Sequence, residues 1–146
     1  MLRVVLDTNI FVSSLLVKEG VPAQVLDAWR DRQYALFISP PIIAEIRSTL
    51  DYPRIRNKYN ITESDIDQLI TLLEHDALIV PGDDPSVSGS IPEDPADEAV
   101  LACAMDARAD LIVSRDRHLL ELEEYQGISI HTVRDFLEIM ESEDHA

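Results

Sequence analysis

Short apolar runs alternate along this chain with longer segments that have the spacing of amphipathic helices. Residues 2–6 form an almost unbroken apolar run with two valines, which predicts a strand buried on both faces. Four further strands are predicted at residues 34–38, 77–80, 111–113 and 128–130. Strands of this length, each separated from the next by helical sequence, are typical of a parallel sheet.

Helix signals occupy the intervals between these runs. Helices are predicted at residues 8–16, from Pro22 onward, at 42–50, from Thr62 onward, at 96–107 and at 133–140. Residues 51–60 hold at most a short helix, residues 114–124 a loop with a short helix, and residues 81–95 a long loop. With right-handed crossovers, this order predicts one three-layer α/β/α domain over residues 1–140 with a five-stranded parallel sheet. Residues 141–146 are expected to be a frayed acidic tail.

Acidic residues follow the predicted strands on one edge of that sheet. Asp7 ends the first strand, Asp116 follows the fourth, and Asp97 starts the helix that leads into the fourth. Glu45, in the first two turns of the third helix, joins them if that helix starts at the same edge. Four converging carboxylates repel one another, and a divalent cation relieves that repulsion, with Mg²⁺ or Mn²⁺ favoured by hard oxygen ligands. The alternative is that each acid only caps a helix or complements its dipole.

Net charge and composition exclude or disfavour several classes of function. The 146 residues include 28 acidic and 12 basic side chains, for a net charge of −16, which disfavours bulk attraction to nucleic acid or an anionic membrane. A single cysteine, Cys103, excludes an intrachain disulfide and is expected to be a small buried side chain. Because no apolar stretch approaches 18 residues and no signal-peptide layout is present, we expect a cytoplasmic protein without a membrane span.

Basic residues gather at two places. Arg115, Arg117 and His118 bracket Asp116, where they either bind backbone phosphates or offset the neighbouring acids. The other cluster consists of Arg47, Arg54, Arg56 and Lys58. It suits contact with RNA, contact with a protein partner, or an ordinary solvated surface.

Four segments together resemble the PIN-domain family of nucleases. Residues 6–9 (LDTN) resemble its opening motif, and residues 41–46 (PIIAEI) resemble the segment with a glutamate on a helix. Residues 94–104 (DPADEAVLACA) resemble the third motif, and residues 109–120 (ADLIVSRDRHLL) the fourth. The match extends over about residues 2–135, and its pattern is most similar to PIN-family toxin components of toxin–antitoxin systems.

This resemblance implies a metal-dependent endoribonuclease that hydrolyses RNA, is inhibited by a small antitoxin protein and frequently forms homodimers. Asp7, Glu45, Asp97 and Asp116 would be the catalytic acids that bind Mg²⁺ or Mn²⁺. Asn9 would hold the Asp7 carboxylate, and Ser114 would contact the metal's water shell or the scissile phosphate. Arg115 and Arg117 are the candidate substrate-binding residues.

Other phosphate-handling folds fit less well. The chain has neither a G-x-G-x-x-G nor a G-x-x-x-x-G-K-[ST] motif, and Asn9 stands where a haloacid-dehalogenase-like phosphatase needs a second aspartate. The main alternative is a non-catalytic module of the PIN fold that binds a protein or an RNA.

Overall fold

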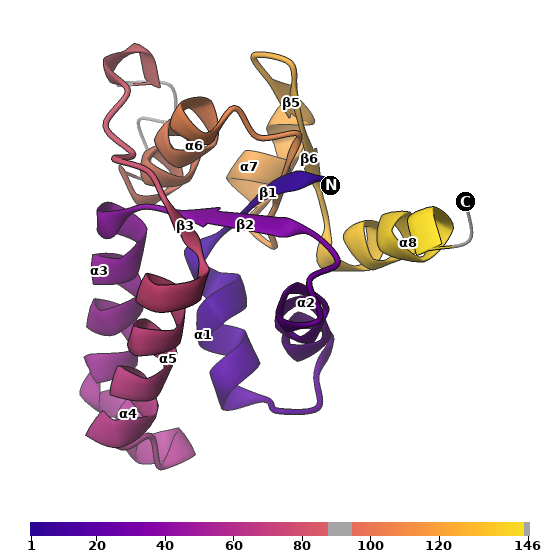
Figure 1. Ribbon diagram of the computed structural model, residues 1–146. Helices are drawn as coiled ribbons and strands as arrows, with labels where there is room; N and C mark the ends of the chain where they lie inside the picture. The colour runs from indigo at the N-terminus through magenta and orange to yellow at the C-terminus, as the bar shows by residue number, and fades with distance from the viewer. Residues whose placement is uncertain (88–94, 145–146) are drawn as a thin grey trace.

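A six-stranded sheet forms the centre of the computed structural model, which describes residues 1–87 and 95–144 (Figure 1). The strand order is β3-β2-β1-β4-β6-β5, and every neighbouring pair is parallel except β5 and β6. The strands are β1 (Arg3–Leu6), β2 (Ala35–Ile38), β3 (Leu78–Ile79), β4 (Leu111–Val113), β5 (Glu124–Tyr125) and β6 (Ile128–His131). The predicted α/β class and the five parallel strands are confirmed.

The predicted strand count of five was wrong, because β5 adds a sixth strand at the edge of the sheet. It pairs antiparallel with β6, with Tyr125 opposite Ile128. Gln126 and Gly127 form the connection and both have positive φ, 51° and 83°, as a two-residue hairpin turn requires. Glu124 and Tyr125 are only two residues and show no apolar alternation, so the sequence pattern did not indicate a strand there.

Helices cover both faces of the sheet. They are α1 (Thr8–Leu16), α2 (Val21–Arg30), α3 (Pro40–Asp51), α4 (Pro53–Tyr59), α5 (Glu63–Asp76), α6 (Pro95–Ala107), α7 (Arg117–Leu122) and α8 (Val133–Asp144). In Figure 1, α1 to α5 lie on one side of the strands and α6 and α7 on the other. This division follows from right-handed crossovers, because the chain moves outward from β1 to β3 and then returns to β4. Helix α8 continues through Asp144, so it includes most of the segment expected to be a tail.

The core lies on both faces of β1, as its apolar sequence predicted. Val4, Val5 and Leu6 are completely buried. Tyr34 and Phe136 pack edge to face with ring centroids 5.0 Å apart, and the Tyr34 hydroxyl donates a 2.7 Å hydrogen bond to the carbonyl of Val25. These contacts join α8 and α2 to the start of β2. Among the described helices, none combines the length and apolar character needed to cross a membrane.

The backbone at Gly82, which follows β3, passes close to the side chain of Ser39. The φ of Gly82 is +66°, and a Cβ added to it would lie 2.5 Å from the Cβ of Ser39. Ser39 is completely buried and is the N-cap residue of α3. A glycine at position 82 therefore lets the chain pass over the junction between β2 and α3, the helix that carries Glu45.

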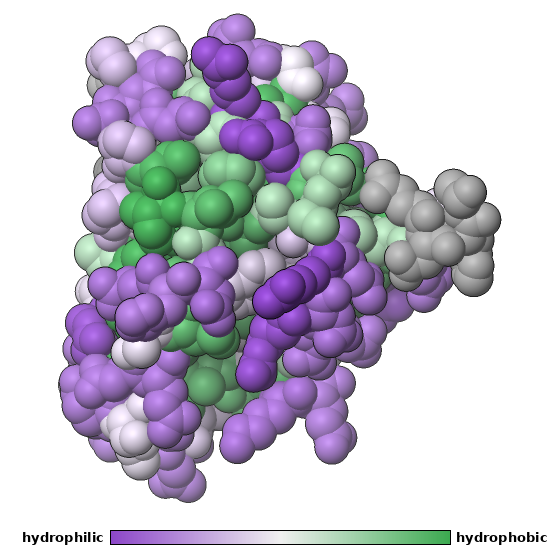
Figure 2. Space-filling view, in the orientation of Figure 1, coloured by the Kyte–Doolittle hydropathy of each residue, from purple (hydrophilic) through white to green (hydrophobic). Residues whose placement is uncertain are grey.

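The outer edge of the sheet at β3 is apolar. Leu78 and Ile79 are 50% and 48% exposed, although their backbones pair with β2. Figure 2 shows an apolar area on the front of the molecule, where β3 runs in Figure 1, with polar surface above and below it. This edge contrasts with β5 at the other side of the sheet, where Glu124 is exposed.

Candidate active site

Asp7 and Ser114 lie side by side because they follow paired central strands. Leu6 is opposite Val113 in the β1–β4 ladder, and the backbone N–H of Asp7 donates to the carbonyl of Val113 at 2.9 Å. The side chains are also joined, since Ser114 Oγ donates a 2.7 Å hydrogen bond to Asp7 Oδ2. Asp7 is 4% exposed and Ser114 is completely buried. The carboxylate of Asp7 is thus held in a fixed place at the carboxyl ends of both strands.

The same serine also orients Asp116. Ser114 Oγ accepts a hydrogen bond from the backbone N–H of Asp116 at 2.9 Å. Asp116 is the N-cap residue of α7, and its Oδ1 accepts from the backbone N–H of His118 at 2.7 Å. One hydroxyl therefore connects the two acidic segments, and the cap fixes the direction of the Asp116 carboxylate.

Asp97 completes a compact group of possible metal ligands. It lies in the first turn of α6 and is 3% exposed. One ligand atom each from Asp97, Asp116 and His118 can be chosen so that all three lie within 4.8 Å of one another. The two carboxylates are hard oxygen ligands that fit Mn²⁺ or Mg²⁺, whereas the imidazole is a ligand more typical of Zn²⁺ or Fe²⁺. The structure thus brings together two of the four predicted acids and places the third, Asp7, beside them through Ser114.

Glu45 is placed differently from the other three acids. It is exposed in the second turn of α3, and it is not one of the three residues in that group. Helix α3 packs against both α1 and α6, the helices that follow Asp7 and carry Asp97. The glutamate is therefore on a neighbouring element, with its side chain in solvent.

Two expectations about supporting residues differ from the geometry. Asn9 is exposed, and among the described residues the hydrogen bond to the Asp7 carboxylate comes from Ser114 and not from Asn9. Ser114 has no exposed surface, so its hydroxyl contacts protein groups and not solvent. His118 was expected either to bind a backbone phosphate or to offset the neighbouring acids. Its position two residues after a capping aspartate is the signal that would have placed it beside Asp116.

The basic residues near the site point in different directions. Arg115 turns toward α1, where its Nη1 donates a 3.2 Å hydrogen bond to Ser13 Oγ. Arg117 is 81% exposed, and its Nε lies 3.6 Å from the carboxylate of Glu121 on the same helix. Arg115 therefore lies against α1, whereas the side chain of Arg117 extends into solvent.

The second basic cluster is largely offset by acids on α5 and α3. Arg47 contacts Glu63 at 3.3 Å and Asp67 at 3.0 Å, and Arg56 contacts Asp51 at 3.5 Å and Glu63 at 3.6 Å. Arg54 and Lys58 form no ion pair within the described part of the chain. Only part of this cluster's charge is available to a partner.

Cys103 is a core residue, as its sequence context predicted. It is completely buried on α6, and burial raises the pKa of its thiol to about 12. The thiol is therefore protonated at neutral pH and is not a nucleophile.

Comparisons with known proteins find relatives in sequence and in fold. An uncharacterized protein of Methanocaldococcus jannaschii is 26% identical over 148 residues, which cover 96% of this chain and 92% of the relative. The structure of VapBC2 from Rickettsia felis, bound to a DNA fragment from their promoter, contains a chain that superposes with a TM-score of 0.61 at 14% identity. That alignment covers 89% of this chain and 98% of the solved one.

A second structure, DNA-bound VapBC from Salmonella typhimurium, has a chain that superposes with a TM-score of 0.60 at 16% identity, covering 91% of this chain and 99% of the other. These two likenesses establish the fold. The family model of the PIN domain matches residues 3–118, which include Asp7, Asp97, Asp116 and the serine that connects them. This chain therefore belongs to the PIN-domain family.

Proposed function

We propose that this protein is a metal-dependent endoribonuclease that hydrolyses RNA phosphodiester bonds. The observation that supports it most is the convergence of Asp97, Asp116 and His118 ligand atoms within 4.8 Å, next to the buried Asp7. Such a concentration of carboxylates is costly without a cation. When bound, Mg²⁺ or Mn²⁺ supplies charge stabilisation for a phosphodiester under attack by water.

Each residue of the site has a role in this proposal. Asp7, Asp97, Asp116 and His118 would hold the cation, and Glu45 on α3 is the proposed fourth acid. Ser114 keeps the carboxylate of Asp7 and the backbone of Asp116 in place through its two hydrogen bonds. Asn9, exposed at the start of α1, and the arginines Arg115 and Arg117 contact the RNA backbone.

The proposed partners are an RNA, a small antitoxin protein and a second copy of this chain. RNA is the proposed substrate, and a small antitoxin protein is the proposed inhibitor, which the likeness to chains of two VapBC structures supports. The net charge of −16 favours an antitoxin segment that is basic. We also propose that the protein is cytoplasmic and forms a homodimer, and that the apolar edge at β3 is available for that contact.

Nuclease assays with single acid-to-amide variants test the activity. The purified protein is incubated with a mixed RNA pool in Mg²⁺, Mn²⁺ or EDTA, and Mn²⁺ binding is measured by calorimetry. Cleavage is expected only with metal, and Asp97→Asn and Asp116→Asn are each expected to lower it about 100-fold or more. Glu74→Gln, which changes an exposed acid on α5, is the matched control and should cleave normally.

Two results would contradict the proposal in different ways. Unchanged cleavage in both aspartate variants would remove these acids from the mechanism. Metal-independent RNA binding without cleavage or Mn²⁺ binding would support the non-catalytic module instead.

A further inference from the structure

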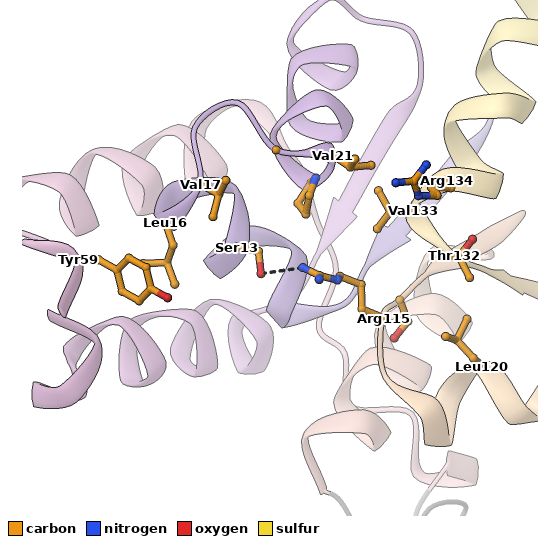
Figure 3. Close-up of a pocket in the computed structure, with 13 residues that line it drawn as sticks. Ser13, Leu16, Val17, Val21, Tyr59, Arg115, Leu120, Thr132, Val133 and Arg134 are labelled. Carbon is orange, nitrogen blue, oxygen red and sulfur yellow. Dashed lines mark hydrogen bonds between the residues drawn. The ribbon is translucent and has the colours of Figure 1, made fainter.

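A pocket of about 570 Å³ lies directly beside the acidic cluster. Ser114, which bonds to Asp7, and Arg115, which precedes Asp116, both line it. Its other walls come from the second half of α1, the start of α2, Tyr59 at the end of α4, and residues 132–134 after β6 (Figure 3). The pocket is within the size range of about 300–1,000 Å³ that is typical of small-ligand sites.

The charge of this pocket is opposite to that of the whole molecule. The described residues that line it include two arginines, Arg115 and Arg134, and no acidic residue. The chain as a whole carries 28 acidic and 12 basic side chains. A positive pocket next to a negative metal site is therefore a local exception in a strongly negative protein, and it marks where an anion can approach.

Both arginines are available to a ligand. Neither forms an ion pair within residues 1–87 and 95–144, and the hydrogen bond of Arg115 is to a neutral hydroxyl, that of Ser13. Arg134 is exposed in the first turn of α8, where the helix dipole disfavours a cation. Helix stability thus does not account for an arginine at this position, whereas binding of an anion does.

Arg134 and the side chains of Leu16 and Tyr59 lie at different ends of the pocket. Figure 3 shows Arg134 at one end, near Thr132, Leu16 and Tyr59 at the other, and the guanidinium of Arg115 between them, directed at Ser13. Val17, which is 53% exposed, lies between them. Guanidinium groups suit a phosphate, hydroxyls suit a ribose, and an apolar or aromatic surface suits a base.

We propose that this pocket binds the nucleotide adjacent to the scissile phosphate of a single-stranded RNA. Arg115 and Arg134 contact the phosphates on either side of that nucleotide, and its base lies against the apolar wall around Val17. The inference rests on the proposed function, since it takes the acidic cluster as the place of cleavage. A strand that passes the cluster at Asp116 and continues past Arg115, its neighbour in the chain, enters this pocket.

Binding measured without cleavage tests the pocket separately from the chemistry. The probe is a fluorescein-labelled single-stranded RNA of about eight nucleotides with mixed sequence, and its Kd is measured by anisotropy in EDTA at several salt concentrations. Arg134→Gln is expected to weaken binding roughly 10-fold and to reduce the salt slope by about one. Arg108→Gln makes the same charge change at an exposed residue that precedes β4, at the opposite ends of the strands, and should leave the Kd unchanged.

Charge substitutions at Val17 test the pocket from its other side. Because this side chain is half exposed, the fold tolerates Val17→Glu and Val17→Lys. The glutamate is expected to weaken RNA binding and the lysine to strengthen it. Thermal unfolding of each variant verifies that the protein is folded.

Three outcomes separate this inference from the proposed function. Equal Kd values for wild type, Arg134→Gln and both Val17 variants would overturn the inference even if RNA is cleaved. Binding of an acidic peptide that depends on Arg134, with no binding of RNA, would also overturn it and assign the pocket to a protein partner. RNA binding that depends on Arg134, without cleavage in any metal, would support the pocket and contradict the nuclease.

Discussion

The hydroxyl of Ser114 donates a 2.7 Å hydrogen bond to the carboxylate of Asp7, a residue 107 positions earlier in the chain. Both side chains are buried, so this bond is made in a region of low dielectric constant, where a lost partner is costly. The same oxygen accepts from the N–H of Asp116. A single small side chain therefore holds the relative positions of two candidate metal ligands.

Removing this hydroxyl should damage both the fold and the site. Ser114→Ala removes one hydrogen bond to a buried carboxylate oxygen and one from a backbone N–H, and we expect a loss of about 1–3 kcal/mol in the free energy of unfolding. Mn²⁺ affinity should fall as well, because Asp7 and Asp116 are no longer held together. Urea unfolding and calorimetry measure the two effects, with Ser48→Ala on the exposed surface of α3 as control. Wild-type values for both would show that Ser114 is dispensable.

Glu45 offers a test of whether an exposed acid belongs to the metal site. Glu45→Gln should leave the free energy of unfolding within about 0.5 kcal/mol of wild type, because the side chain is in solvent. If the carboxylate reaches the cation, Mn²⁺ affinity should fall about 10-fold, as for the loss of a supporting ligand. Glu74→Gln is again the matched control. An unchanged Mn²⁺ affinity in Glu45→Gln would exclude Glu45 from the site.

The buried phenol of Tyr34 predicts a loss of stability in alkali. Burial raises the pKa of Tyr34 far above its ordinary value of about 10, so the folded chain holds the proton more tightly than the unfolded chain. The protonated Tyr34 therefore contributes fully to the free energy of unfolding below about pH 10, and this contribution is lost as the pH rises above that value. Tyr34→Phe should be about 1 kcal/mol less stable at neutral pH, because the carbonyl of Val25 loses its donor, and should show a weaker alkaline decline.

Tyr52 is the control for this experiment, since it is 57% exposed. Tyr52→Phe should keep the alkaline decline of the wild type in chemical unfolding measured from pH 7 to 11. A decline of equal steepness in Tyr34→Phe would show that other groups cause it.

Gly82 and Gly127 form a matched pair for separating backbone strain from steric overlap. Both have positive φ, but a Cβ on Gly127 meets nothing within 4 Å, whereas one on Gly82 lies 2.5 Å from Ser39. Gly127→Ala should cost about 1–2 kcal/mol, from strain alone. Gly82→Ala should cost clearly more and should also weaken Mn²⁺ binding if Glu45 on the displaced α3 contributes. Similar melting temperatures for the two variants would contradict this.

The positions of Asp7 and Asp116 could be predicted from the sequence because sheet topology determines them. Asp7 and Asp116 follow central parallel strands, whose buried runs are easy to recognise, and any right-handed arrangement of these strands brings them to one edge. The missed strand β5 lacks such a run, since its pairing depends on the turn at Gln126 and Gly127. Local patterns thus predicted the centre of the sheet better than its edge.

Residues whose role depends on tertiary neighbours were not predictable in the same way. Arg47 and Arg56 look like a basic patch in the sequence, but Glu63 on α5 lies against both and offsets their charge. No sequence pattern marked Arg134 as a candidate binding residue. It became one only because the fold places it in the same pocket as Arg115. Spacing along one element does not show which side chains a second element brings to it.

The separation of 107 residues between Asp7 and Ser114 has a consequence during synthesis. β1 leaves the ribosome well before its neighbour β4 and the segment of Ser114 and Asp116. Long-range pairings of this kind form late in folding, because the intervening chain must first be ordered. A growing polypeptide therefore lacks the assembled acidic cluster, and any activity of this site begins only once the segment through His118 has been made and has folded onto β1.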